Sequence, residues 1–295
     1  MYEEKTKQKS LGIFALFGLL PLLAFVIVVM IPFISGLLLS LTNWKGVLDG
    51  IQFIGLGNYA AAIKDPGFWA SMQLTVVYVL FVTILTNVLA FLLASLVTSG
   101  FKGQNLCRTG YFTPNLIGGV ILGFIWQFIF TRVFVFIGQT LDIGLLAKNW
   151  LTVPQTALWT LILVSVWQNA GYMMLVYVAG LMGIDKSLLE ASQIDGASSW
   201  QRLLRVKLPL MVPAFTITLF LTLRRAFMVY DVNLSLTKGG PYNSTQLIAM
   251  HVYNDAFVNQ NLGPGQAKAF LLFAIVAAVA MLQVYILKNK EVDSL

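Results

Sequence analysis

Two apolar segments of this sequence carry polar side chains at a spacing that could form a binding surface. Ser165, Asn169 and Tyr172 follow one another at i, i+4 and i+7, and Thr222 and Arg225 lie three residues apart in the second segment. Residues at these intervals lie on one face of a helix. A phenol ring, an amide, hydroxyls and a guanidinium are groups that stack on or hydrogen-bond a polar ligand. The spacing therefore predicts one polar face on each of two helices.

The two polar faces are expected at the same level. Asn169 lies 16 residues before Asp185, and Arg225 lies 16 residues after Pro209. At about 1.5 Å per residue, both side chains lie roughly 24 Å from the polar stretch that joins the two helices. A shared level favours a common pathway. The structural alternative, that the hydroxyls and amides only hydrogen-bond between helices, stays open.

Arg224 and Arg225 form a charged doublet inside an apolar segment, where ionisable residues are costly and usually functional. Adjacent helical residues point about 100° apart, so the two cannot face one path. Arg225 is in register with Thr222 and is the pathway candidate. Three roles are open for it: binding the hydroxyls of a ligand, attracting an anionic ligand, or pairing with Asp231.

The polar stretch 185–209 has the signals of a structured hairpin. Ser187 with Glu190, and Ser198 with Gln201, each match a capping box, in which the two side chains satisfy exposed amides at a helix start. An Asp-Gly pair between the two boxes supplies a turn, where glycine takes a positive φ without strain. We therefore predict a helix, a tight turn and a second helix.

The elements around these groups are membrane spans. The chain has 295 residues, of which 58% are hydrophobic and 11% charged, against about a quarter charged in a soluble domain. A helix needs about 20 apolar residues to cross a bilayer. Pro21 and Pro32 are expected to kink the first span. We predict six spanning helices, at 11–41, 71–98, 111–130, 156–183, 208–229 and 267–288.

Other classes are disfavoured by what the sequence lacks. The first span is too long for a secretory signal and has no cleavage site, so it is expected to be retained. A single cysteine, Cys107, excludes internal disulfides, and His251 stands alone, so no metal site is expected. The net charge of +7 reflects topology and does not indicate nucleic-acid binding.

Basic residues orient the spans by the positive-inside rule. With both termini in the cytoplasm, the short inner segments hold 11 of the 19 basic residues and the outer loops hold six. The inner set is Lys5, Lys7, Lys9, Lys102, Arg108, Lys186, Arg202, Arg205, Lys207, Lys288 and Lys290. The outer set is Lys45, Lys64, Arg132, Lys148, Lys238 and Lys268. This orientation puts the hairpin in the cytoplasm.

The hairpin also resembles a known motif. Glu190-Ala191-Ser192, Gly196 after three further residues, and Val206-Lys207-Leu208-Pro209 after nine more resemble the EAA motif of binding-protein-dependent ABC importers. Ser192 and Val206 depart from the family pattern with little change of size. Asp195-Gly196-Ala197 is similar to the carbohydrate branch.

Further stretches resemble the larger-type (first) permease subunit of maltose and multiple-sugar importers. They are Thr42-Asn43-Trp44, Phe53-Ile54-Gly55-Leu56-Gly57-Asn58-Tyr59, Phe68-Trp69, Leu236-Thr237-Lys238-Gly239-Gly240-Pro241 and Ser244-Thr245. The resemblance implies an all-α polytopic membrane protein with the type I ABC importer permease fold. It implies three parts: residues 1–70 with the first span, a permease core at 71–288 that includes the hairpin, and a cytoplasmic tail at 289–295.

The resemblance also implies partners and roles. A second homologous permease subunit, a dimeric ABC ATPase and an extracytoplasmic sugar-binding protein are expected in a bacterial cell membrane, with a di- or oligosaccharide as cargo. In such importers the hairpin couples to the ATPase, and its substrate contacts come from the two helices that flank it. The implied coupling residues are Glu190, Ala191, Ser192, Asp195, Gly196 and Ala197.

The chain is not expected to be an enzyme. It has no G-x-x-x-x-G-K-[ST] phosphate loop, so ATP and Mg²⁺ are expected on the partner ATPase, with no cofactor in this chain. The main alternative is an ion-coupled secondary transporter, which would need intramembrane carboxylates. No Asp or Glu lies in the six predicted spans. A membrane enzyme would need a catalytic cluster, which the sequence does not show.

Overall fold

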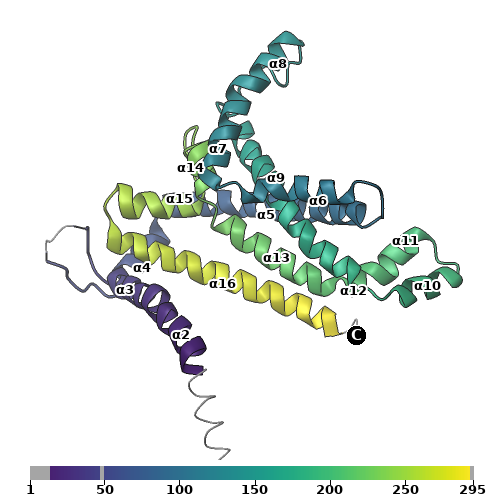
Figure 1. Ribbon diagram of the computed structural model, residues 1–295. Coiled ribbons are helices and arrows are strands. Elements are labelled where there is room, and N and C mark those ends of the chain that lie inside the picture. The colour runs from purple at the N-terminus through teal and green to yellow at the C-terminus, as the bar shows by residue number, and fades with distance from the viewer. Residues whose placement is uncertain (1–13, 47–49, 293–295) are drawn as a thin grey trace, which may run out of the picture. The chain divides into compact units, whose positions relative to one another are not determined.

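The computed structural model describes residues 14–46 and 50–292 (Figure 1). The N-terminal tail with Lys5, Lys7 and Lys9, and the last three residues of the predicted C-terminal tail, lie outside the described residues. The chain divides into two compact units. The smaller runs up to Asp65 and includes Val252–Leu271, and the larger comprises Pro66–His251 and the chain from Leu272 onward. Residues 252–271, which the sequence puts in the core, therefore cluster with the N-terminal unit.

The described residues form helices, with a single isolated β-bridge between Thr42 and Phe53. Five helices in this part of the chain are long and apolar enough to cross a membrane, and a bent pair makes a sixth span. The pair joins Ser199–Leu210 to Val212–Phe227 at 68°. Six predicted spans are thereby accounted for. The five continuous ones are Phe17–Ser40, Pro66–Val97 (α5), Gly119–Thr140, Pro154–Met182 (α9) and Leu262–Lys288, within α16 (Leu262–Val292).

The predicted third span at 111–130 is wrong in its bounds. The chain forms α6 (Gln104–Phe112), then a 3-10 turn η3 (Thr113–Leu116), and only then α7 (Gly119–Phe128). Pro114 lacks an N–H donor and ends the first helix. The helix then continues past Arg132 through η4 (Ile129–Val133) and α8 (Phe134–Thr140). The uncharged run at 109–131 therefore predicts neither the helix break at η3 nor the end of the span. Arg132, predicted to lie in an outer loop, lies within a helix.

Three prolines follow wide helical turns. The π-helical turns η1 (Ala15–Leu19), η2 (Val26–Met30) and η5 (Leu203–Lys207) each end two residues before a proline, at Pro21, Pro32 and Pro209. A proline ring removes one backbone donor and crowds the preceding turn, and a widened turn relieves that crowding. The first span (α2, Leu20–Phe25; α3, Ile31–Ser40) thus accommodates both of its prolines within a helix.

In the smaller unit, the loop after the first span folds back on the end of that span. The Asn58 side chain, at the start of α4 (Gly57–Lys64), donates from Nδ2 to the carbonyls of Ser40 (2.8 Å) and Thr42 (2.7 Å). The Ser40 hydroxyl also lies 2.7 Å from the Tyr59 hydroxyl. These bonds satisfy carbonyls that a helix leaves unpaired at its C-terminus.

The same unit contains a buried ion triad. Nζ of Lys268 lies 2.6 Å from Oδ2 of Asp65 and 2.6 Å from Oδ2 of Asp255. Only 7% of Lys268 is exposed. Lys268 therefore lies inside α16 rather than in an outer loop, and it joins the end of α4, the turn η6 (Asn254–Val258) and the last long helix.

In the larger unit, α5, α9 and α13 (Val212–Phe227) pack side by side around a buried polar network (Figure 1). Tyr177 donates to Oδ1 of Asn87 (2.7 Å) and accepts from the Thr218 hydroxyl (2.7 Å). Asn87 in turn donates to the Thr222 hydroxyl at 3.3 Å. One chain of hydrogen bonds thus joins three helices. Each polar side chain finds its partner within the protein, because the bilayer core provides no water.

A second packing site in the larger unit joins α7 to α14 (Asp231–Leu236) through small residues. Gly119 and Gly123 lie at i and i+4. A Cβ on Gly123 would come within 1.9 Å of the Ser235 hydroxyl, and one on Gly119 within 2.8 Å of the Asp231 Cβ. Glycine is needed here because the two helices touch almost backbone to backbone. After α14 the chain continues to α15 (Ile248–Tyr253).

Candidate functional site

Arg225 is the centre of a polar cluster between α13, α9 and the turn η3. Its Nη1 group donates to Oδ1 of Asn115 (2.8 Å) and to Oδ1 of Asn169 (2.9 Å). The guanidinium carbon lies 4.5 Å from the centre of the Tyr172 ring, a cation–π contact. The predicted common level of Asn169 and Arg225 is confirmed, because the two side chains are hydrogen-bonded.

A glycine on α9 brings the third partner into reach. A Cβ on Gly171 would lie 1.8 Å from the carbonyl oxygen of Tyr111 and 2.9 Å from the amide nitrogen of Phe112. The end of α6 therefore rests directly on the backbone of α9. The chain turns through η3 immediately afterwards, and Asn115 arrives beside Asn169. The Gln168 side chain adds a bond to the carbonyl of Ile117 (3.3 Å).

Asn115 is the member of the cluster that the sequence does not predict, because it lies in an uncharged run that indicates one continuous span. The signal was present, since Pro114 precedes it and breaks the helix. A polar side chain directly after a proline in an apolar run marks a place where backbone and amide groups face the protein interior.

The other two predicted pathway residues lie within the helix packing. Ser165 is buried and accepts a 2.6 Å hydrogen bond from the Tyr78 hydroxyl of α5. Thr222 is buried, accepts from Asn87 and donates to the carbonyl of Thr218 at 2.7 Å. The structure therefore brings Asn169, Tyr172 and Arg225 together and keeps Ser165 and Thr222 in interhelical bonds.

The charge of Arg225 is not matched by a nearby carboxylate. Among the described residues, no ion pair joins Arg225 to Asp231 or to another acidic group. Arg224 is exposed, on a different side of the helix. The cluster is thus a half-buried cation held by two amide oxygens and a ring.

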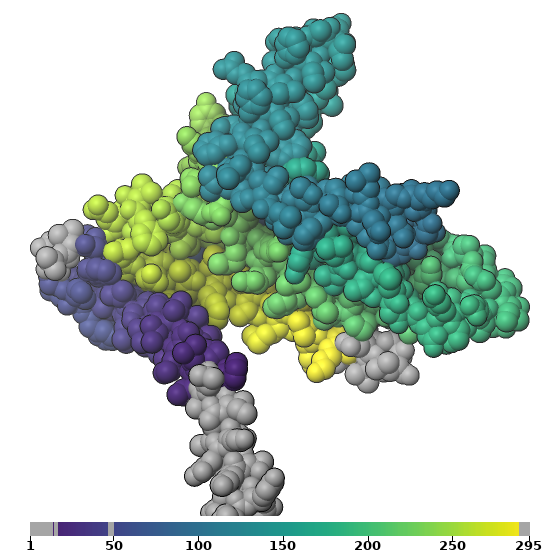
Figure 2. Space-filling model, viewed as in Figure 1, coloured from purple at the N-terminus to yellow at the C-terminus, as the bar shows by residue number. Residues whose placement is uncertain are grey.

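The hairpin is a capped element that stands out at the right-hand edge of the larger unit (Figures 1 and 2). It consists of α10 (Lys186–Ile194) and α11 (Ser199–Arg202). At the second helix, the predicted capping box is confirmed: the Ser198 hydroxyl accepts from the Gln201 amide, and the Gln201 side chain accepts from the Ser198 amide.

The turn of the hairpin is closed by glycine. Gly196 has φ +77°, its amide donates to the carbonyl of Gln193 (3.0 Å), and the amide of Ala197 donates to that of Ser192 (3.0 Å). This pair of bonds is the Schellman motif, which takes glycine because a Cβ is strained at positive φ. The predicted turn at Asp195-Gly196 is therefore confirmed.

The capping box predicted at Ser187 and Glu190 is wrong. Asp185 is the N-cap of α10, and its Oδ1 accepts a 2.9 Å bond from the amide of Ser187. This bond is the principal reason that the pKa of Asp185 lies below its usual value. The acidic residue two positions earlier thus takes the cap, and Glu190 is left exposed on the helix.

The predicted coupling residues form one accessible surface. Glu190, Ala191, Asp195 and Gly196 are exposed, whereas Ser192 and Ala197 are half-buried. Apolar side chains also face outward, with Ile194 87% and Trp200 67% exposed. A small, apolar and acidic surface of this kind is typical of a protein-binding element.

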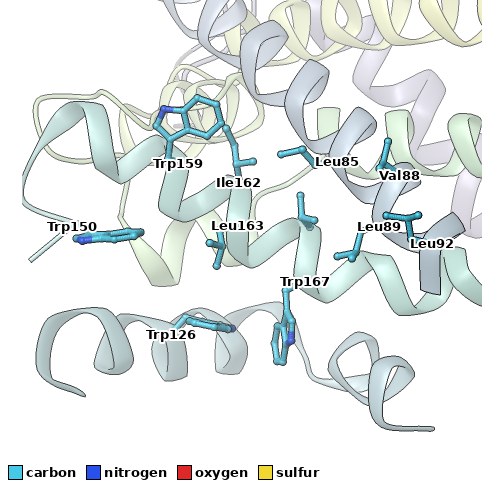
Figure 3. A pocket seen from close by; sticks show the side chains of 11 residues that line it. Leu85, Val88, Leu89, Leu92, Trp126, Trp150, Trp159, Ile162, Leu163 and Trp167 are labelled. Carbon is cyan, nitrogen blue, oxygen red and sulfur yellow. The ribbon is translucent and has the colours of Figure 1, made fainter. Parts of the chain in front are cut away.

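A separate groove in the larger unit is almost wholly apolar (Figure 3). It encloses ≈ 540 Å³ between α5, α7 and α9. Trp126 and Trp167 meet edge to face there, with centroids 5.2 Å apart. Its hydrocarbon and indole lining, inside the spanning region, suits apolar neighbours rather than water. The lining residues are Leu85, Val88, Leu89, Leu92, Trp126, Trp150, Trp159, Ile162, Leu163, Val166 and Trp167.

Together, a helical membrane bundle, a polar cluster within it and a projecting capped hairpin define a membrane transport protein. A family model described as binding-protein-dependent transport system inner membrane component matches residues 87–291. The chain therefore belongs to this family and is a multi-pass permease subunit of a bacterial ABC transporter, without catalytic groups or a cofactor of its own.

Individual relatives cover nearly the whole chain. It is 44% identical over 272 residues to the probable starch degradation products transport system permease protein AmyD of Thermoanaerobacterium thermosulfurigenes, covering 92% of each chain. It is 30% identical over 276 residues to the multiple sugar-binding transport system permease protein MsmF of Streptococcus mutans, covering 94% of this chain and 95% of that protein. These relatives confirm the predicted resemblance.

A solved structure has the same fold. It is a bacterial ABC transporter involved in the import of the acidic polysaccharide alginate, with TM-score 0.83 and 21% sequence identity, covering 98% of this chain and 99% of that chain. The predicted permease fold is confirmed. Family membership also decides against the ion-coupled alternative, because ATP hydrolysis on separate subunits drives transport in this family.

Proposed function

We propose that this chain forms one half of the pathway through which a di- or oligosaccharide enters the cytoplasm. The Arg225 cluster is the observation that carries the proposal. It brings an aromatic ring, two amide side chains and a guanidinium together between α9, α13 and η3. These are the groups that bind a polyhydroxylated ring. The names of the two permease relatives, which concern starch products and multiple sugars, support the same cargo class.

The complete importer contains further subunits in this proposal. A second homologous permease forms the other half of the pathway, a dimeric ATPase binds ATP and Mg²⁺, and an extracytoplasmic binding protein delivers the saccharide. Both termini and the hairpin lie in the cytoplasm, as the distribution of basic residues favours.

The hairpin couples the pathway to the ATPase. Glu190 pairs with a basic group of the ATPase, and the exposed small residues around Gly196 allow close contact with its surface. A capped helix pair transmits displacement, since its ends are fixed by hydrogen bonds on both sides of the turn. Residues Ala191, Ser192, Asp195 and Ala197 complete this docking surface.

Uptake by the reconstituted complex tests the proposal. The four-component importer is placed in proteoliposomes, and labelled malto-, manno- and uronate oligosaccharides are offered with the binding protein and internal ATP. We expect ATP-dependent accumulation of at least one of them. Glu190→Lys is expected to abolish uptake and the stimulation of ATP hydrolysis, while Lys186→Ala serves as the matched control on the same helix. No saccharide uptake by the wild-type complex would contradict the proposed cargo, and normal uptake by Glu190→Lys would contradict the coupling role.

A further inference from the structure

The protein contacts of the Arg225 guanidinium involve Nη1 and one face of the group, and they leave Nε and Nη2 without a hydrogen bond among the described residues. Both hydrogen atoms of Nη1 are engaged, one by Asn115 and one by Asn169. The Tyr172 ring covers one face of the guanidinium. Among the described residues, no hydrogen bond is recorded for Nε or Nη2. The open edge is therefore the side formed by these two nitrogens.

This open edge has a specific chemical preference. Nε–H and one N–H of Nη2 point in parallel, and that pair matches the two oxygens of a carboxylate. The three contacts on the other side fix the plane of the group, so it loses little freedom on binding. A lysine at this position would present a point charge without such a fork.

The charge of the cluster favours the same ligand. Arg225 is half-buried within a span, and its protein partners are two neutral amides and a phenol ring. A cation in this environment is costly until an anion joins it. Neutral partners orient the charge without cancelling it. The charge thus remains available to a passing ligand.

We propose that the Nε/Nη2 edge of Arg225 binds the carboxylate of an acidic saccharide, such as a uronate-containing oligosaccharide, during its passage. Asn115 and Asn169 are positioning residues that aim this edge. The inference rests on the proposed function, since it requires the cluster to line the pathway. The relatives' names include starch products and alginate, which differ in charge, so the fold alone does not determine the charge of the cargo.

The experiment compares acidic and neutral trisaccharides on the complete complex. Uronate trimers of the galacturonate, glucuronate and mannuronate types and maltotriose are offered to proteoliposomes with the binding protein present. Three variants are compared with wild type: Arg225→Lys keeps the charge and loses the fork, Arg225→Gln loses both, and Arg224→Gln removes the exposed neighbour. Basal ATP hydrolysis and the thermal midpoint of each complex report folding.

We expect wild type to take up a uronate trimer, Arg225→Lys to lose at least about tenfold of that uptake, and Arg225→Gln to lose more. Arg224→Gln should behave as wild type. Uptake of maltotriose but of no uronate would overturn the carboxylate inference and leave the proposed function standing. Uronate uptake unaffected by Arg225→Lys would also overturn it, because the fork would then be unnecessary. Uptake of no uronate and of no neutral saccharide, the manno-oligosaccharides included, would instead overturn the proposed function.

Discussion

Asn115 and Arg225 are 110 residues apart in the chain and joined by a 2.8 Å hydrogen bond between Oδ1 and Nη1. The bond connects a 3-10 turn to the C-terminal part of α13. It exists because Pro114 ends one helix and Gly171 lets that helix end lie on α9. The position of the Arg225 charge therefore depends on a break in one helix at Pro114 and on the missing side chain of Gly171 in another.

Asn115→Ala should lower the rate of saccharide uptake without unfolding the complex. A hydrogen bond to a charged group contributes about 1.5–3 kcal/mol, so its removal is expected to lower transport efficiency about tenfold or more. Initial uptake rates over a range of cargo concentration measure the effect. Asn105→Ala, at an exposed position of α6, is the control. Equal rates for the two variants would mean that Asn115 does not position Arg225.

Gly171→Ala should displace the end of α6. The new Cβ would lie 1.8 Å from the carbonyl oxygen of Tyr111, a distance that backbone atoms can relieve only by moving apart. Overpacking of this kind costs about 1–3 kcal/mol, so the thermal midpoint of the complex should fall. Gly110→Ala is the matched control, because nothing lies within 4 Å of a Cβ there. A Gly171→Ala complex as stable as the Gly110→Ala complex would contradict this close approach.

Asp185→Ala should loosen the start of α10, whereas Ser187→Ala should have little effect. Asp185 is the cap, and the Ser187 side chain is not. Amide hydrogen exchange of residues 187–190 measures the difference. The lowered pKa of Asp185 also gives a sign for the pH dependence. The stabilisation is fully present above the unfolded pKa of about 3.9 and is lost as the pH falls through the lower folded value. Faster exchange in Ser187→Ala than in Asp185→Ala would reverse the assignment.

Lys268→Met should destabilise the smaller unit strongly. Removal of the cation would leave Asp65 and Asp255 facing each other without their shared partner. Breaking a buried ion pair from one side costs roughly 3 kcal/mol or more. Thermal unfolding of the purified complex measures the loss, and Lys64→Met, exposed on α4, is the control. If both variants unfold at the wild-type temperature, the triad is not a stabilising element.

Hydrogen bonds also control the titration of this triad. Burial alone would raise the pKa of Asp255, but the hydrogen bonds from Lys268 and Asn261 outweigh it and hold the pKa below its usual value. The contribution of the carboxylate is therefore present above about pH 4 and disappears as the pH falls through the folded pKa.

The sequence predicted the membrane-spanning helices better than the breaks within and between them. Runs of uncharged residues identified the spans, because a bilayer demands continuous apolar helices. The same runs gave no sign of the 3-10 turn at Thr113–Leu116, because that turn contains no charged residue. Helical spacing placed Asn169 and Arg225 at one level, and the hydrogen bond between them confirms it.

Helical spacing could not separate the residues of the Arg225 cluster from residues that only pack between helices. Ser165 and Thr222 share a helical face with cluster members but are bonded to Tyr78 and Asn87 of α5. The packing of a third helix, α5, against that face is tertiary structure, which the spacing of residues within one helix cannot predict. Likewise, Asp185 and Ser187 both precede α10, and only the backbone geometry shows which of them caps it.

The 68° bend between Ser199–Leu210 and Val212–Phe227 makes the two sides of the cluster mechanically unequal. Asn169 lies on α9, which runs as one uninterrupted helix to Met182, close to the start of the hairpin. Arg225 stands beyond an elbow at Met211. A push on the hairpin is thus expected to translate one side and swing the other. The Arg225 side of the cluster is therefore expected to move through a larger arc than the Asn169 side.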